Sequence, residues 1–282
     1  MTRQQKKTLK MALSYLVIVL IGCLLLFPIA WMISCAFKTN EEIFGSIALL
    51  PKSFSLQNFV DGWKSAGSYT YLTYFLNSFA LVVPTTVLTI ASSALVAYGF
   101  ARFEFPFKKQ LFALLLATLM LPNSVVIIPR YVLFNKFGWV DSYMPWWVPA
   151  ILACYPFFIY QLIQFMRSIP RDLDESAYID GCSTFRVFWQ ILLPLMKSSL
   201  FSAGLFQFLW TYNDYFNSLI FINSVKKYTV SLALRLSVDA ESVVVWGRVM
   251  AMACVAVLPL VLLFFAAQKY FVEGIATSGL KG

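Results

Sequence analysis

The sequence predicts an all-α protein that crosses a membrane six times, with both termini in the cytoplasm. Of its 282 residues, 60% are hydrophobic and only 12% are charged, whereas soluble domains are about half apolar and about a quarter charged. The apolar residues form runs long enough for helices that span a bilayer. Thirteen of the 22 Lys and Arg residues fall in segments that this topology places inside, eight fall outside and Arg130 lies within a span. This excess of inside charge follows the positive-inside rule and sets the orientation.

The composition also excludes several classes of function. Basic residues in membrane loops explain the net charge of +9, so nucleic-acid binding is not expected. The absence of His rules out His-based zinc sites and a His general base. Four of the five Cys residues stand in apolar runs and Cys182 stands in a loop. We therefore expect neither a disulfide framework nor a metal site.

The first two spans follow from uninterrupted apolar runs. Residues 1–10 are short and basic, and 11–37 follow without a charged residue. That run is too long for the core of a signal peptide, so we expect an uncleaved span that opens a single membrane domain, 11–282. A polar external segment of about 38–71 leads to the second span, 72–101, which ends at a basic cytoplasmic turn.

The third span, 111–135, is interrupted by prolines. Pro122 and Pro129 free backbone groups that neighbouring helices or a wet cavity must satisfy. Arg130 lies close to the outer end of this span. Its simpler interpretation is snorkelling to the interface, and its alternative is contact with a solute inside the membrane.

The remaining spans are apolar runs between charged segments. The fourth, 143–166, opens with Trp146 and Trp147, which are typical of an aromatic belt at the membrane interface. The fifth is expected at 198–222 and the sixth at 246–270. A short cytoplasmic tail, residues 271–282, completes the chain.

A charged cytoplasmic loop, 167–197, separates the fourth and fifth spans. It reads Glu175-Ser176-Ala177-Tyr178-Ile179-Asp180-Gly181 and, after nine further residues, Ile191-Leu192-Leu193-Pro194. Gly181 suits the left-handed residue that ends a short helix, and Ser183 or Thr184 can cap a second helix. The apolar face of that helix should lie on the bilayer surface, and its members are Phe185, Phe188, Trp189 and Leu192. Pro194 fits the start of the next span.

The spacing E-x-A-x-x-x-G, nine residues, I-x-L-P resembles the cytoplasmic loop of ABC-importer permeases, which are membrane subunits that dock on separate ATPases. Ser176 stands where the family usually has Ala, and both side chains are small enough for close packing. The resemblance implies a coupling helix in which Glu175 faces a basic residue of the ATPase. Ala177 and Gly181 would allow close approach, and Asp180 would contact the ATPase or cap the helix. The expected coupling residues are Glu175, Ser176, Ala177, Asp180, Gly181, Ile191, Leu193 and Pro194.

The fifth span carries polar residues at helical spacing along one side. An Asp inside a span costs about 3 kcal/mol or more unless it meets water or a partner, so Asp214 should face a pathway or another helix. Amides supply paired hydrogen bonds for hydroxyls, and an indole packs on the C–H face of a sugar ring. The alternative is that Asn213 and Asp214 tie helices together. The candidate pathway residues are Gln207, Trp210, Asn213, Asp214 and Asn217, with Asn123 from the third span.

Three further passages resemble carbohydrate-type importer permeases. They are residues 49–59 after the first span, the passage 210–214 in the fifth span, and the ending 279–282. The resemblance makes the ending a secondary contact with the ATPase pair. Its residues are Gly279, Leu280, Lys281 and Gly282.

The resemblance implies a non-catalytic permease subunit of the bacterial or archaeal cytoplasmic membrane that translocates a di- or oligosaccharide. The sequence has no G-x-x-x-x-G-K-[ST] loop, so we expect ATP and Mg²⁺ on partner subunits and no cofactor on this chain. The implied partners are a second, homologous permease subunit, two ATPase subunits and an extracytoplasmic solute-binding protein, all assembled at the lipid bilayer.

Other functions remain as alternatives. The same class of importer could carry glycerol phosphate or a polyol, but a phosphate favours several inward-facing bases and only Arg130 is near the membrane interior. An ion-coupled secondary transporter would favour paired intramembrane carboxylates or inverted repeats. A channel would need a ring of pore-lining groups. Without His or paired acids, a membrane-embedded enzyme is the weakest alternative.

Overall fold

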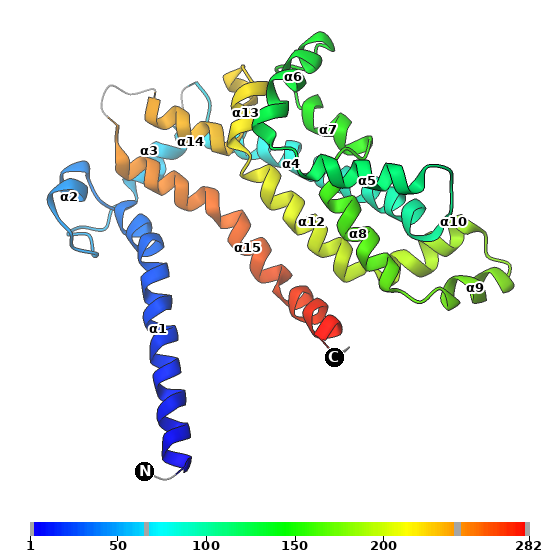
Figure 1. Cartoon of the computed structure of the whole chain (residues 1–282). Coiled ribbons are helices and arrows are strands. Elements are labelled where there is room, and N and C mark those ends of the chain that lie inside the picture. The colour runs from blue at the N-terminus through cyan, green and yellow to red at the C-terminus, as the bar shows by residue number, and fades with distance from the viewer. Residues whose placement is uncertain (1–2, 65–67, 240–243, 280–282) are drawn as a thin grey trace. The chain divides into compact units, whose positions relative to one another are not determined.

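The computed structural model of the chain describes residues 3–64, 68–239 and 244–279 (Figure 1). The regular elements in these ranges are helices, which confirms the all-α prediction. Among the described residues, four segments are long and apolar enough to cross a membrane, and they are Lys10–Cys35, Tyr71–Arg102, Met144–Ser168 and Trp246–Ala266. Counting each of two bent helix pairs as one span raises the number to as many as six, in agreement with the predicted fold class.

The described chain divides into two compact units, residues 1–71 with 233–259 and residues 72–232 with 260–282. The elements of the first unit are α1 (Arg3–Cys35), α2 (Asn40–Gly45), α3 (Gln57–Lys64), most of α14 (Val230–Asp239) and the start of α15 (Trp246–Gly279). Helix α1 is long because its apolar run has no break other than Pro28.

A buried lysine organises the polar segment that follows α1. Lys38 is 1% exposed; its ammonium lies 4.6 Å from the centre of the Trp31 ring and donates to the carbonyl of Ala48. Asn58 of α3 donates to the carbonyl oxygens of Ala36 (3.0 Å) and Lys38 (2.9 Å). These bonds satisfy backbone groups left open where α1 ends, and they fold the segment back onto that end.

The second unit holds the helices that position the candidate site. In order they are α4 (Tyr71–Arg102), α5 (Lys108–Leu119), α6 (Asn123–Lys136), α7 (Met144–Ile151), α8 (Pro156–Ser168), α9 (Asp172–Ile179), α10 (Thr184–Arg186), the π-helix η1 (Val187–Leu192), α11 (Leu193–Leu195), α12 (Lys197–Tyr212), α13 (Tyr215–Phe221) and the 3₁₀ turn η2 (Val225–Lys227). Helix α8 packs against both α5 and α12. Buried side chains such as Tyr98, Leu162 and Val187 join α4, α8 and η1 in one apolar core.

Several helices of this unit are broken where the sequence carries Pro, Asn or Asp. Helices α5 and α6 meet at 103°, and the bend falls beside Pro122, where an interruption was predicted. Helix α6 continues through Pro129. Helix α12 ends at Tyr212, and α13 starts after Asp214, whose side chain accepts from the backbone N–H of Asn217 and so caps the new helix.

The loop 167–197 forms the two predicted helical segments. Gly181 has φ +80° after α9, and the Ser183 side chain accepts from Arg186 N and caps the next segment, as expected. The predicted single apolar face is wrong. Phe188 and Leu192 are buried, whereas Phe185 and Trp189 are 66% and 62% exposed. The second segment runs into a π-helix, in which i→i+5 bonds shift residues away from the 3.6-residue spacing.

Candidate functional site

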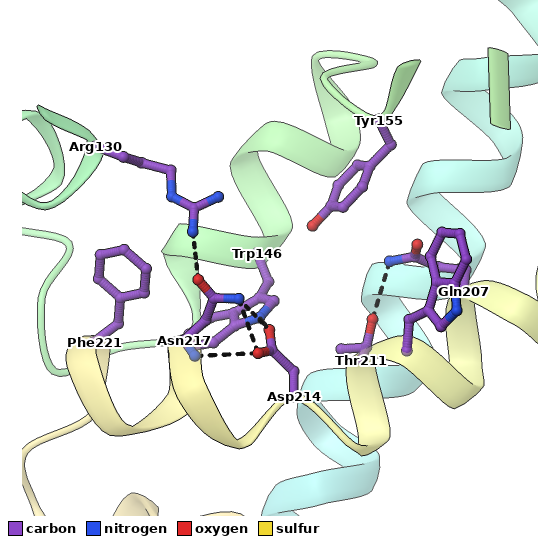
Figure 2. Close-up of a pocket in the computed structure, with 9 residues that line it drawn as sticks. Arg130, Trp146, Tyr155, Gln207, Thr211, Asp214, Asn217 and Phe221 are labelled. Atoms are coloured by element: carbon purple, nitrogen blue, oxygen red, sulfur yellow. Dashed lines mark hydrogen bonds between the residues drawn. The ribbon is translucent and has the colours of Figure 1, made fainter. Parts of the chain in front are cut away.

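Two features of the second unit contain the residues that the sequence singled out. The first is a cavity of about 280 Å³ between the broken helices (Figure 2). One side comes from the segments α6 to α8 and consists of Arg130, Trp146 and Tyr155. The other side comes from α12 and α13 and consists of Gln207, Trp210, Thr211, Asp214, Asn217 and Phe221.

A hydrogen-bond chain runs along one wall of this cavity. Asn217 Nδ2 donates to both carboxylate oxygens of Asp214, each at 2.8 Å. Trp146 Nε1 of α7 donates to Asp214 Oδ2 at 3.2 Å. Arg130 Nη2 of α6 donates to Asn217 Oδ1 and, at 3.3 Å, to Asn123 Oδ1. Figure 2 shows the succession from Arg130 through Asn217 to Asp214. Asp214 thus both lines the cavity and ties helices together, which were the two alternatives left open by the sequence.

The part of the lining that α12 supplies combines a buried amide with an indole. Gln207 is 2% exposed, and its Nε2 donates to Thr211 Oγ1 at 3.0 Å. The Trp210 ring is half exposed and packs on the rings of Phe157 and Phe158, with centroids 5.0 and 5.3 Å apart. A rigid aromatic surface therefore stands beside a set of hydrogen-bonding groups, which is the chemistry that binds polyhydroxylated molecules.

The structure separates some of the predicted pathway residues. Gln207, Trp210, Asp214 and Asn217 line the cavity. Asn213 lies outside this lining, and its amide donates to the carbonyl of Leu209 at 2.9 Å. Asn123 also lies outside this lining, and its Oδ1 accepts a hydrogen bond from the lining residue Arg130. Because α12 stops at Tyr212, the uniform helical spacing assumed for the stripe does not extend past that residue.

The sequence analysis did not identify four residues of the cavity lining: Trp146, Tyr155, Thr211 and Phe221. Trp146 was interpreted as part of an interface belt. Arg130 also lines the cavity, and its alternative interpretation, contact with a solute, stays a prediction. The Arg130 guanidinium carbon lies 5.5 Å from the centre of the Phe221 ring, and its Nε has no hydrogen-bond partner among the described residues. Tyr155 lies at the start of α8, directly before Pro156. That proline was the sequence signal that could have placed a helix break, and with it Tyr155, inside the predicted fourth span.

The second feature is the loop 167–197, which is anchored to the end of α4. Arg102 Nε lies 2.6 Å from Asp174 Oδ2, and Arg102 Nη2 donates to the carbonyl of Ile169 at 3.1 Å. Tyr98 Oη donates to the carbonyl of Thr184 at 3.0 Å. Burial raises the pKa of the Asp174 carboxyl, and the nearby Arg102 opposes that rise. The loop is thus held to α4 at both of its helical segments.

The predicted coupling residues divide between the inner and outer sides of this loop. Ala177 is 4% exposed and packs inward. The residues on the outer side are Glu175, Ser176, Asp180, Gly181 and Pro194. Ile191 and Leu193 are partly buried. Of the predicted secondary contact, Gly279 ends α15, and Leu280, Lys281 and Gly282 lie outside the described residues.

Comparison with known proteins identifies a group to which the chain is similar. Residues 90–277 match the family described as the binding-protein-dependent transport system inner membrane component. The chain is 35% identical over 256 residues to the probable ABC transporter permease protein YurM of Bacillus subtilis, covering 91% of this chain and 84% of that protein. It is 30% identical to the trehalose/maltose transport system permease protein MalG of Thermococcus litoralis, covering 99% of each.

A solved structure is similar in fold. It is the crystal structure of a bacterial ABC transporter involved in the import of the acidic polysaccharide alginate, with a TM-score of 0.82 and 16% identity. The match covers 96% of this chain and 99% of the other. At this identity, the likeness concerns the fold alone.

Proposed function

Because the chain belongs to the family of binding-protein-dependent transport system inner membrane components, we propose that it is the transmembrane permease subunit of an ATP-driven importer for a di- or oligosaccharide. The observation that carries the proposal is the cavity that both the Asp214–Asn217–Arg130 chain and the Trp210 side chain line. The names of several relatives support the cargo class, since they include transport proteins for trehalose/maltose and arabinooligosaccharides.

The chemistry of the cavity favours a sugar over a phosphate. Its two charged side chains, Arg130 and Asp214, are of opposite sign and are bridged by Asn217. A phosphate would need an excess of positive charge, whereas hydroxyl groups are matched by mixed donors and acceptors. At about 280 Å³, the cavity is near the lower limit of ligand pockets, roughly 300 Å³. We expect it to hold one sugar unit at a time.

The coupling to ATP is proposed to run through the cytoplasmic loop. Glu175 of α9 and Asp180, the residue that follows α9, are exposed and would contact an ATPase subunit. Ala177 packs inward, and Asp174 fixes the helix to α4. Movement of the loop would then reach α4 directly and α12 through α11. The helical segments Thr184–Leu195 and Lys197–Tyr212 meet at a bend of 77°. The proposed connection from the loop to α12 therefore runs through two angled segments rather than one straight helix.

The remaining parts of the assembly are proposed from the family. They are a second, homologous permease subunit, an extracytoplasmic solute-binding protein, and two ATPase subunits that hold ATP and Mg²⁺. The proposed setting is the cytoplasmic membrane of a bacterium or archaeon, with both termini, the loop 167–197 and the tail 271–282 on the cytoplasmic side. Residues 279–282 are proposed to form a secondary contact with the ATPases.

The test uses the complete complex in proteoliposomes. ATP hydrolysis and uptake are measured for a panel of labelled di- and oligosaccharides, a polyol and glycerol phosphate. One saccharide should stimulate both, and Asn217→Ala should lower its uptake at least tenfold. Asn213→Ala is the matched control, because that amide lies outside the cavity lining. Co-purification of the ATPases checks assembly. Uptake driven by an ion gradient without ATP would refute the proposal in favour of a secondary transporter.

A further inference from the structure

A second cavity in the same unit has a different character. It measures about 470 Å³ and lies between two turns, the one joining α4 to α5 and the one joining α8 to α9. Its charged lining residues are Arg102, Glu104, Lys108, Arg167 and Arg171. Four cations and one carboxylate therefore face a single space.

Two of these cations are neutralised by partners. Arg102 is paired with Asp174 at 2.6 Å, with side chains 5% and 10% exposed. Lys108 is paired with Glu104 at 2.9 Å. In the part of the chain that the structure describes, no ion pair involves Arg167 or Arg171. Counted together with Asp174, the charged residues at the cavity therefore carry an excess of two positive charges.

The two unpaired arginines are held in place by contacts that leave most of their donors unused. The Arg167 guanidinium carbon lies 5.1 Å from the centre of the Phe112 ring, so the ring occupies its face. Arg171 Nη2 donates to the carbonyl of Ala101 at 3.4 Å. A guanidinium has five N–H donors in one plane, and a stacked or tethered guanidinium is pre-oriented for paired bonds to phosphate oxygens.

The positive field of the cavity also affects its one lining carboxylate. Lys108, and after it Arg171 and Lys109, lower the pKa of the Glu104 carboxyl. Glu104 is therefore ionised at neutral pH, and it remains bound to Lys108 rather than turning toward the arginines. An anion entering the cavity meets two open guanidinium groups.

The position of the cavity selects the kind of anion. It lies at the ends of α4 and α8, each part of an apolar segment that can cross a membrane. The adjoining turn carries Phe107, which is 72% exposed, next to Lys108 and Lys109. An exposed aromatic ring beside basic residues is typical of the membrane interface. Basic pockets between spanning helices on the cytoplasmic side bind anionic lipid headgroups.

We propose that Arg167 and Arg171 bind the phosphodiester of an anionic phospholipid in the cavity between the α4–α5 and α8–α9 turns. The lipid would sit against the same turn that anchors the cytoplasmic loop, since the Arg102–Asp174 pair and Arg171 border the site. Its occupancy therefore links the charge of the inner leaflet to the position of α9. The inference does not depend on which solute is carried.

The proposal is tested with the full chain assembled with its ATPase subunits in neutral detergent. Native mass spectrometry measures binding of phosphatidylglycerol, of zwitterionic phosphatidylcholine and of inorganic phosphate. The double variant Arg167→Gln/Arg171→Gln should bind phosphatidylglycerol about thirtyfold more weakly, at about 1 kcal/mol for each cation. The matched control Arg186→Gln/Lys197→Gln removes two cations from the same loop outside the cavity and should change binding less than twofold.

Further arms separate the possible outcomes. Arg167→Lys/Arg171→Lys keeps the charge but removes the paired donors, and it should give an intermediate affinity. Equal losses of phosphatidylglycerol affinity in the double variant and the control would overturn the proposal. The lipid would then respond to the net positive charge of the loop and not to a site at Arg167 and Arg171. Inorganic phosphate displacing the lipid at equal concentration would overturn it in favour of a free-phosphate site. The binding measurement is repeated with the permease chain without its ATPase subunits. If the lipid binds only then, the proposal is overturned, because an acidic surface of the ATPase would occupy the two arginines in the complex.

Discussion

Arg102 Nε at the end of α4 lies 2.6 Å from Asp174 Oδ2 in α9, and the two side chains are only 5% and 10% exposed. The pair joins a membrane-spanning candidate helix to the loop that carries the importer-type sequence pattern. Asp174 is the residue directly before Glu175 and is not part of that pattern. The pattern therefore covers both sides of α9, with Glu175 exposed and Ala177 buried, but it omits the buried carboxylate that fixes the helix to α4.

Removing Arg102 should destabilise the second unit and introduce a pH dependence. Arg102→Gln leaves Asp174 buried without its partner, which costs about 3 kcal/mol. Burial raises the pKa of Asp174 and Arg102 counteracts this, so the variant's pKa rises further. A folded-state pKa above the unfolded value means that the folded state binds the proton more tightly, so stability increases as pH falls through that pKa. Thermal unfolding between pH 8 and 4 should show the variant regaining stability on acidification.

The controls for this prediction remove the titrating group. Arg102→Gln/Asp174→Asn should lose the pH-dependent recovery, and Glu175→Gln, which changes an exposed neighbour, should unfold like the parent protein. A variant Arg102→Gln whose unfolding temperature is independent of pH would show that the carboxylate finds another partner.

Gly181 should tolerate substitutions in the order set by its backbone. Its φ is +80°, and a Cβ built there meets no atom within 4 Å, so strain rather than collision determines the cost. Ala should cost about 1 to 2 kcal/mol, Asn less, since it adopts left-handed conformations more readily, and the β-branched Val most. We expect ATPase association, measured by co-purification, and transport to be reduced least by Asn, more by Ala and most by Val. Equal association for all three would separate this turn from coupling.

The sequence was sufficient to predict the helical class and the two helical segments of the loop 167–197. Charge-free runs and the glycine after α9 have local causes, so they can be predicted from neighbouring residues alone. The cavity could be predicted only in part. Asp214 and Asn217 were identified as polar residues inside a span, but Asp214 also caps α13 and ends the helix that was expected to continue to Ile222.

The residues whose position in the cavity was not predicted depend on long-range packing. Arg130 and Trp146 reach the cavity because α6 turns by 103° from α5 and because α7 is separate from α8. Proline predicts that a helix bends, but it does not predict in which direction. In the same way, the π-helical turns at Val187–Leu192 divided an apolar face that a 3.6-residue period had treated as continuous.

Two glycines in long helices should respond in opposite ways to Ala. At Gly247, a Cβ would lie 2.4 Å from Asn58 Nδ2 and 2.5 Å from the Lys38 carbonyl oxygen, so the backbone of the first unit must shift. We expect Gly247→Ala to destabilise that unit by about 1 to 3 kcal/mol. At Gly99 no atom lies within 4 Å, and Ala should stabilise α4 by up to about 1 kcal/mol. Unfolding temperatures in detergent test both, and a stable Gly247→Ala protein would contradict the close approach.

Asp141 should contribute stability that is lost in acid. It accepts from Asn223 N (3.0 Å), Ser224 N (2.8 Å) and Lys227 Nζ (2.9 Å), and so joins the α6–α7 and α13–α14 connections. Burial alone raises the pKa of its carboxyl, but the hydrogen bonds from Ser224, Lys227 and Asn223 together hold it well below the usual range. A folded-state pKa below the unfolded value gives stability that is complete above about pH 4 and lost as pH falls further.

The variant Asp141→Asn isolates this contribution, because Asn also tolerates the φ of +58° at this position. The variant should unfold at a lower temperature at pH 7. The difference from the parent protein should shrink as pH falls from about 4 towards 2, because Asp141 of the unfolded parent then takes up a proton while the folded carboxylate stays ionised. Because the group lies outside the candidate membrane-spanning segments, titrant reaches it in detergent and in proteoliposomes alike. A difference that stays constant over this pH range would mean that the Asn side chain, rather than the lost charge, causes the destabilisation.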